Sequence, residues 1–126
     1  MTDSLYREQI LEHWRTPQNF GKLAHPTHEA FLNNPLCGDE IGIQLNVKNG
    51  TVEEVRFHGT GCAISIAATS MLTEIILGKK FDALKKIKKE DVFDLLGVVP
   101  SPSRTKCALL GLSTFRRALQ IFEQTQ

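Results

Sequence analysis

Apolar and polar residues alternate most regularly in the segment that begins at residue 41. The apolar members are Ile41, Ile43, Leu45 and Val47, and the residues between them are Gly42, Gln44, Asn46 and Lys48. A period of two is typical of a strand with one apolar and one polar face. Asn49-Gly50 follows and supplies the positive φ angles of a type I′ turn. Because Val52, Val55 and Phe57 continue the apolar pattern, the sequence predicts an antiparallel hairpin.

Longer segments on either side have helical patterns. Apolar residues between positions 5 and 14 fall mostly on one side of a helix, which should end near Thr16 because Pro17 disfavours helical geometry before it. A helix over residues 62–77 would be apolar on nearly every side, and Gly78 after it is a typical helix stop, so the sequence predicts a buried helix. An amphipathic pattern over residues 107–122 predicts the closing helix.

The remaining segments are shorter. A short strand is expected at 30–32, two short helices at 81–96, and a loop at 97–106, which contains two prolines. The solvent side of the short helices should carry Lys85, Lys86, Lys88 and Lys89. A helix, an antiparallel hairpin and further helices, in this order, predict an α+β fold. We expect a small antiparallel β-sheet of about three strands covered by helices.

Composition narrows the class of protein. The chain has 126 residues, 41% of them apolar and 23% charged, which predicts a single globular domain over residues 1–126. The formal net charge of +1 gives no strong field, so neither nucleic acid nor a membrane surface is expected as a partner. No apolar run approaches the roughly 20 residues of a membrane span, and the first residues lack the apolar core of a secretory signal. We therefore expect a cytoplasmic protein.

The three cysteines are too few, and odd in number, for a disulfide framework. Cys37 and Asp39 flank Gly38, which allows the backbone bend that both side chains need to reach one ion. A thiolate and a carboxylate side by side repel each other unless a cation lies between them. Cys62 and Cys107 are each predicted to open a helix, where unpaired amides and the helix dipole favour the thiolate.

Together, the three thiolates and the carboxylate are enough ligands for one tetrahedral metal ion or for the two irons of a [2Fe–2S] cluster. The oxygen of Asp39 is a harder donor than sulfur and holds thiolate-loving centres less firmly. An electron-transfer site would be expected to use four cysteines, whereas a site that releases its cargo benefits from one weak ligand. This argument favours a scaffold over a ferredoxin.

Two other classes of protein compete with this interpretation. A structural zinc module is one, but such sites are commonly built from Cys and His without Asp. A cysteine hydrolase needs a His oriented beside the nucleophile, and none of the histidines lies in a recognisable catalytic motif. The histidines are His13, His25, His28 and His58. His58 is the nearest to a cysteine, either close to the site or at a solvent-facing strand end.

The segments that contain the cysteines resemble the motifs of a known family. They are Asn34-Pro35-Leu36-Cys37-Gly38-Asp39, Gly59-Thr60-Gly61-Cys62-Ala63-Ile64-Ser65 and Arg104-Thr105-Lys106-Cys107. Together with residues 5–19, they are similar, in order and over nearly the whole chain, to the IscU/SufU family (the NifU N-terminal domain).

This resemblance implies a metal site formed by Cys37, Asp39, Cys62 and Cys107. It also implies a pyridoxal-phosphate-dependent cysteine desulfurase as partner, which donates persulfide sulfur to one of the thiols. We expect Cys37 and Cys107 as acceptors, since an acceptor must be exposed and Cys62 heads a buried helix. A scaffold would assemble a transient [2Fe–2S] cluster and pass it to apo iron–sulfur proteins, and the isolated protein would carry zinc.

Two features depart from IscU-type members, which usually carry His before the last Cys and a Leu-Pro-Pro-Val-Lys segment. Here Lys106 precedes the last Cys, and Val98-Val99-Pro100-Ser101-Pro102 replaces the segment. Residues 104–107 are closer to SufU-type members, which act as zinc-dependent sulfur acceptors. Cluster scaffold and zinc-bound sulfurtransferase therefore both stay open, and only the second would make the chain an enzyme.

Overall fold

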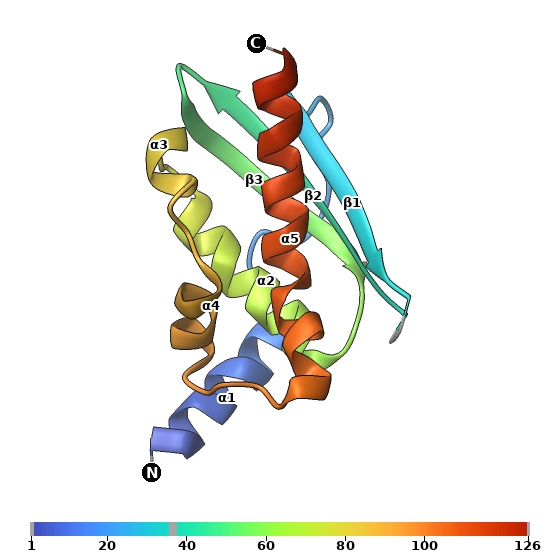
Figure 1. Cartoon of the computed structure of the whole chain (residues 1–126), viewed down its shortest axis with the longest axis vertical. Coiled ribbons are helices and arrows are strands. Elements are labelled where there is room, and N and C mark those ends of the chain that lie inside the picture. The colour runs from blue at the N-terminus through green and yellow to red at the C-terminus, as the bar shows by residue number, and fades with distance from the viewer. Residues whose placement is uncertain (1, 36–37, 126) are drawn as a thin grey trace.

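A computed structural model describes the backbone of residues 2–35 and 38–125 and the side chains of residues 6–35 and 38–120. Its elements are α1 (Thr2–Arg15), β1 (His28–Asn34), β2 (Asp39–Lys48), β3 (Thr51–Thr60), α2 (Ala63–Ile76), α3 (Phe81–Leu84), α4 (Lys89–Leu96) and α5 (Pro102–Thr125). The helix α5 packs on β1 and β2, α2 packs on β3, and α1 packs on α2 (Figure 1). No helix in the described part of the chain is both long and apolar enough to cross a membrane.

The sheet confirms the predicted α+β fold. Its three strands are antiparallel in the order β1-β2-β3. Asn49 (φ 55°) and Gly50 (φ 75°) connect β2 to β3, and positive φ at both residues is what a type I′ turn requires. The strand expected at 30–32 is longer than predicted, because pairing with β2 extends it from His28 to Asn34 although its own sequence is largely polar.

The helices cover one face of the sheet. Ile41, Ile43 and Leu45 of β2 and Phe57 of β3 are fully buried and belong to the hydrophobic core shared with α2 and α5. Successive side chains of a strand point to opposite faces. Asp39 is in phase with these residues of β2 and therefore lies on the helix-covered face.

The middle of the other face of β2 is buried, contrary to the alternation in the sequence. Gly42 and Gln44 are both buried. The Gln44 side chain accepts a hydrogen bond from the Leu23 backbone N–H at 2.7 Å and donates one to Glu29 Oε2 at 3.0 Å. The connection between α1 and β1 therefore crosses this face, and its backbone satisfies the buried amide.

The helix α2 and the two short helices follow the prediction. The N-cap of α2 is Cys62, Gly78 (φ 83°) follows its end, and most of its residues are buried. The predicted pair of short helices corresponds to α3 and α4. The exposed residues of this region include Lys85, Lys86, Lys88 and Lys89.

The start of α5 differs from the prediction. The helix begins at Pro102, five residues before Cys107, so the loop expected at 97–106 is wrong from Pro102 onward. Proline fits the first turn of a helix because its φ is preset and no N–H is needed there. The carbonyl of Ser101 accepts a hydrogen bond from the Thr105 N–H at 3.0 Å. Cys107 consequently lies inside the helix rather than at its N-terminus.

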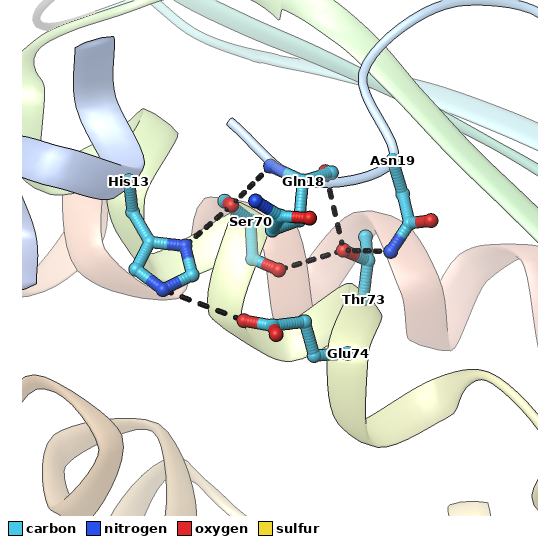
Figure 2. A network of polar contacts seen from close by, with 6 residues as sticks. All are labelled: His13, Gln18, Asn19, Ser70, Thr73 and Glu74. Carbon is cyan, nitrogen blue, oxygen red and sulfur yellow. Dashed lines mark hydrogen bonds and ion pairs between the residues drawn. The ribbon is translucent and has the colours of Figure 1, made fainter. Parts of the chain in front are cut away.

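A network of polar contacts joins the end of α1 and the segment that follows it to α2 (Figure 2). Ser70 Oγ lies 2.7 Å from His13 Nδ1 and accepts a hydrogen bond from the Gln18 N–H at 2.8 Å. Thr73 Oγ1 accepts one from Asn19 Nδ2 at 3.1 Å and donates to the Ser70 carbonyl at 2.6 Å. What we call the α1–α2 network consists of His13, Gln18, Asn19, Ser70, Thr73 and Glu74.

Candidate metal centre

Side chains from three separate parts of the chain converge at one point. Asp39, Cys62 and Cys107 each offer one ligand atom, and these atoms all lie within 4.8 Å of one another. Asp39 begins β2, Cys62 precedes α2, and Cys107 belongs to α5. The structure therefore brings together three of the four residues that the sequence singled out. The fourth, Cys37, lies outside the described residues.

A glycine turn places Asp39. Gly38 has a φ of 74°, in the left-handed region that favours glycine, and its N–H donates to the Asn34 carbonyl at 2.8 Å. The backbone bend expected at Gly38 is thus present, and β2 begins directly after it. Asp39 ends up 5% exposed, a buried carboxyl group at the edge of the helix-covered face.

Two glycines bring the chain from β3 to Cys62. Gly59 has a φ of 141°, and a Cβ atom there would overlap the carbonyl oxygen of Glu40 in β2. Only glycine therefore allows β3 to approach β2 this closely at residue 59. Gly61 packs against Asp39, since a Cβ atom at Gly61 would lie 3.2 Å from Asp39 Cγ. The thiol of Cys62 does not cap α2. Its backbone N–H donates to Asp39 Oδ1 at 3.3 Å, which ties the two candidate ligands together.

Cys107 differs from the prediction in both position and exposure. Because α5 begins at Pro102, only Cys62 of these two cysteines lies at a helix N-terminus. Cys107 is 4% exposed, whereas Cys62 is partly exposed. The expectation that Cys107 is the more accessible thiol is therefore wrong. Cys107 lies on the face of α5 that packs on the sheet, which its sequence position beside Lys106 did not indicate.

The site contains buried polar atoms that lack partners. Among the residues that the structure describes, the buried side-chain oxygen and nitrogen atoms without a hydrogen-bond partner are Asp39 Oδ2 and Ser65 Oγ. A buried carboxylate oxygen without a donor is costly unless a cation or another group compensates it. One oxygen of Asp39 is bound by the Cys62 amide and the other is directed to no donor. This donor set, with two sulfurs beside the carboxylate, fits a thiophilic cation.

His58 does not reach this site. Its ring stacks on Phe31 with centroids 6.2 Å apart, and both rings lie over Gly42 on the face of the sheet opposite to Asp39. Burial and the charge of Lys22 lower the pKa of His58, and burial lowers the pKa of His28. No histidine joins the cluster of candidate ligands within the described residues. A cysteine hydrolase therefore finds no support in the arrangement.

The comparison with protein families decides the family. The model described as NifU-like N terminal domain matches residues 5–126. The chain belongs to this family. Among the relatives of this NifU-like domain, the iron-sulfur cluster assembly scaffold protein IscU of Aquifex aeolicus is 36% identical over 123 residues, 96% of this chain and 78% of the relative. The zinc-dependent sulfurtransferase SufU of Bacillus subtilis is 32% identical over 134 residues, 93% of this chain and 90% of the relative.

Solved structures share the fold of this NifU-like domain. A nitrogen-fixing NifU-like protein (N-terminal) from Brucella abortus superimposes with a TM-score of 0.83 over 98% of each chain, at 20% identity, a likeness that shows the fold alone. A protein from Fervidobacterium islandicum, described as a scaffold for the SUF system, gives a TM-score of 0.76 at 26% identity, over 89% of this chain and 94% of that one. The predicted family and fold are both confirmed.

Sequence reasoning missed two residues of the site. Gly61 keeps the space beside Asp39 free of a side chain, and the buried hydroxyl of Ser65 lies against the same glycine. A single serine near the start of a predicted helix gave no signal of its own. The spacing Gly61-Cys62-x-x-Ser65 puts the hydroxyl in the first turn of α2, on the same end of the helix as Cys62. This spacing is the sequence signal that could have identified Ser65.

Proposed function

We propose that this NifU-like domain is an iron–sulfur cluster scaffold that accepts sulfur from a cysteine desulfurase and passes a [2Fe–2S] cluster to apo-proteins. The observation that carries the proposal is the meeting of Asp39, Cys62 and Cys107 within 4.8 Å, with one Asp39 oxygen buried and unpartnered. Cys37, two residues before Asp39, is the proposed fourth ligand. Similarity to the Aquifex aeolicus scaffold over 96% of the chain supports this function.

The arrangement suits a cargo that must leave. The Cys62 N–H holds Asp39 Oδ1, so the carboxylate is oriented while Oδ2 stays available. An oxygen donor among thiolates is the weakest ligand of the set for a soft centre. A bound zinc ion or cluster supplies the positive charge that pairs these anions. Asp39 is therefore the proposed release point, and the cysteines are the firmer ligands.

Sulfur transfer needs an accessible thiolate. The acceptor thiolate attacks the outer sulfur of the desulfurase persulfide, a new S–S bond forms as the old one breaks, and the donor cysteine leaves as a thiolate without net oxidation. Cys37 and Cys107 are the proposed acceptors. Because Cys107 is 4% exposed, we place it second, receiving sulfur after the first transfer rather than directly from the partner.

A second function, zinc-bound relay of persulfide sulfur, is favoured by a specific observation. The zinc-dependent sulfurtransferase of Bacillus subtilis matches this chain over 90% of its own length. The same four residues would hold zinc, and sulfur would pass on without cluster assembly. A structural zinc module, the alternative from another class, is the least favoured because a buried aspartate is a poor choice for a permanent thiolate site.

A reconstitution experiment on protein purified without oxygen distinguishes the cluster scaffold from the zinc-bound sulfur relay. The protein is incubated without oxygen with a cysteine desulfurase, cysteine, ferrous iron and a reductant, which supplies the electrons that convert persulfide sulfur to the sulfide of the cluster. Visible absorption and metal content are then measured. A scaffold develops the absorption of a sulfide-bridged iron cluster, which a Cys37→Ser variant should lose. A colourless protein that holds one zinc per chain and accepts radiolabelled sulfur would favour the relay. A protein that takes up neither metal nor sulfur would contradict both.

A further inference from the structure

The hydroxyl of Ser65 is the exception among the buried hydroxyls of α2. Thr69 Oγ1 donates to the Ser65 carbonyl at 2.9 Å, Ser70 belongs to the α1–α2 network, and Thr73 donates to the Ser70 carbonyl at 2.6 Å. Ser65 is fully buried, and its Oγ has no hydrogen-bond partner among the described residues. Buried polar groups in native proteins are nearly always bonded, so an orphaned hydroxyl needs a reason.

The position of this hydroxyl provides the reason. A Cβ atom at Gly61 would lie 3.1 Å from Ser65 Oγ and 3.2 Å from Asp39 Cγ, so both side chains flank the same missing Cβ. The second orphaned atom of the described residues, Asp39 Oδ2, belongs to that neighbouring carboxyl group. One group can only accept a hydrogen bond when ionised, and the other can donate one. Asp39 Oδ2 and Ser65 Oγ both lack a hydrogen-bond partner among the described residues.

We propose that Ser65 is a positioning residue that donates a hydrogen bond to the Asp39 carboxylate once a metal ion is bound. The proposal rests on the proposed function, in which Asp39 is a metal ligand. With Cys62 N–H on one side and Ser65 O–H on the other, the carboxylate is held against swinging between one-oxygen and two-oxygen binding. Hydrogen bonds to a ligand carboxylate fix its orientation and typically change metal affinity by about 10–100-fold. Ser65 thereby sets how readily Asp39 leaves the metal.

This role makes the metal-free and metal-bound proteins respond differently to Ser65→Ala. In the metal-free protein, the variant removes a buried hydroxyl that bonds nothing, so the melting temperature should stay equal or rise. In the zinc-bound protein, the variant should weaken zinc binding by about 10-fold. A merely structural hydroxyl would give the reverse, a lower melting temperature and unchanged affinity. Ser65→Thr keeps the hydroxyl and should restore most of the affinity.

The experiment measures zinc affinity by competition with a chromophoric chelator, and melting of the metal-free forms. Ser70→Ala is the matched control, because it removes a buried serine hydroxyl of the same helix that is bonded. We expect this control to lower the metal-free melting temperature and leave zinc affinity unchanged. Combining Ser65→Ala with Asp39→Ala tests whether the hydroxyl acts through the carboxylate, since its effect on affinity should then vanish.

The failures of the two proposals are distinguishable. If the parent protein binds one zinc per chain and Ser65→Ala binds it equally well, the role of Ser65 is overturned and the proposed function stands. Lower metal-free stability of Ser65→Ala, equal to that of the Ser70→Ala control, would also overturn it. A parent protein that binds no zinc and no iron would overturn both proposals together.

Discussion

Two polar clusters lie along α2, and they differ in how their hydrogen bonds are satisfied. In the α1–α2 network, Ser70 and Thr73 are fully buried and bonded to partners from the segment that follows α1 (Figure 2). At the N-terminal end of the same helix, Asp39 Oδ2 and Ser65 Oγ are buried without partners among the described residues. The same helix therefore carries one closed cluster and one open cluster.

The closed cluster has a consistent assignment of donors. The Gln18 N–H can only donate, so Ser70 Oγ accepts from it, and the Ser70 O–H can donate a hydrogen bond to His13 Nδ1. This favours the tautomer with the proton on Nε2, which faces Glu74 Oε1 at 3.4 Å. Satisfied buried networks rigidify a fold, whereas an unsatisfied one is costly until something binds. The first cluster therefore stabilises the fold through its own hydrogen bonds, whereas the second has the donor set that the proposed metal ion would satisfy.

Asp39→Ala should have the largest effect, because it should weaken zinc binding at the open cluster and leave the closed cluster unchanged. Removal of a metal ligand should weaken zinc binding by more than about 100-fold, beyond the effect of losing a neighbouring hydrogen-bond donor. Melting of the metal-free protein should change by less than about 4 °C, since the lost bond to the Cys62 N–H is offset by removing a buried unpartnered oxygen. Chelator competition and thermal melting measure the two quantities. Unchanged zinc affinity would show that the open cluster is not a metal site.

Thr73→Val should affect the closed cluster alone. Valine has nearly the shape of threonine, so the variant removes the acceptor of Asn19 Nδ2 without leaving a cavity. We expect the free energy of unfolding to fall by about 1–2 kcal/mol, with zinc affinity unchanged. Urea unfolding measures the first quantity. Thr69→Val is the matched control and should cost less, because among the described residues Thr69 Oγ1 bonds only the Ser65 carbonyl of its own helix. Equal costs would mean that the link to α1 adds nothing.

Local signals predicted most of the fold. The hairpin could be read from a period of two and from Asn49-Gly50, because turn and strands are specified within one short segment. The length of β1 could not, since pairing with β2 makes Asn33 and Asn34 part of a strand. The start of α5 was missed because Pro102 suits both a loop and the first turn of a helix.

The chemistry of the site could be predicted, but its geometry could not. Asp39 was identified by its residue type and the neighbouring Gly38, and Cys62 by its place at the start of a predicted helix. The burial of Cys107 depends on which face of α5 meets the sheet, and it follows only from the register of that helix. The orphaned hydroxyl of Ser65 depends on the packing of β2, the Gly61 segment and α2 together. Such tertiary contacts leave no pattern in a single sequence.

Glu74→Gln should have the smallest effect and shows which part of the closed cluster stabilises it. Glu74 lies 3.4 Å from His13 Nε2, but its side chain is 52% exposed, so water competes with the pair. Exposed ion pairs contribute little, and glutamine keeps an oxygen that can accept from Nε2–H. We therefore expect the free energy of unfolding to change by less than about 0.5 kcal/mol, with little dependence on salt. Urea unfolding at low and high salt measures this. A loss as large as that of Thr73→Val, and present only at low salt, would mean that charge rather than the buried hydroxyls holds α1 on α2. In that case the buried hydroxyls of Ser70 and Thr73 would not be what stabilises the closed cluster.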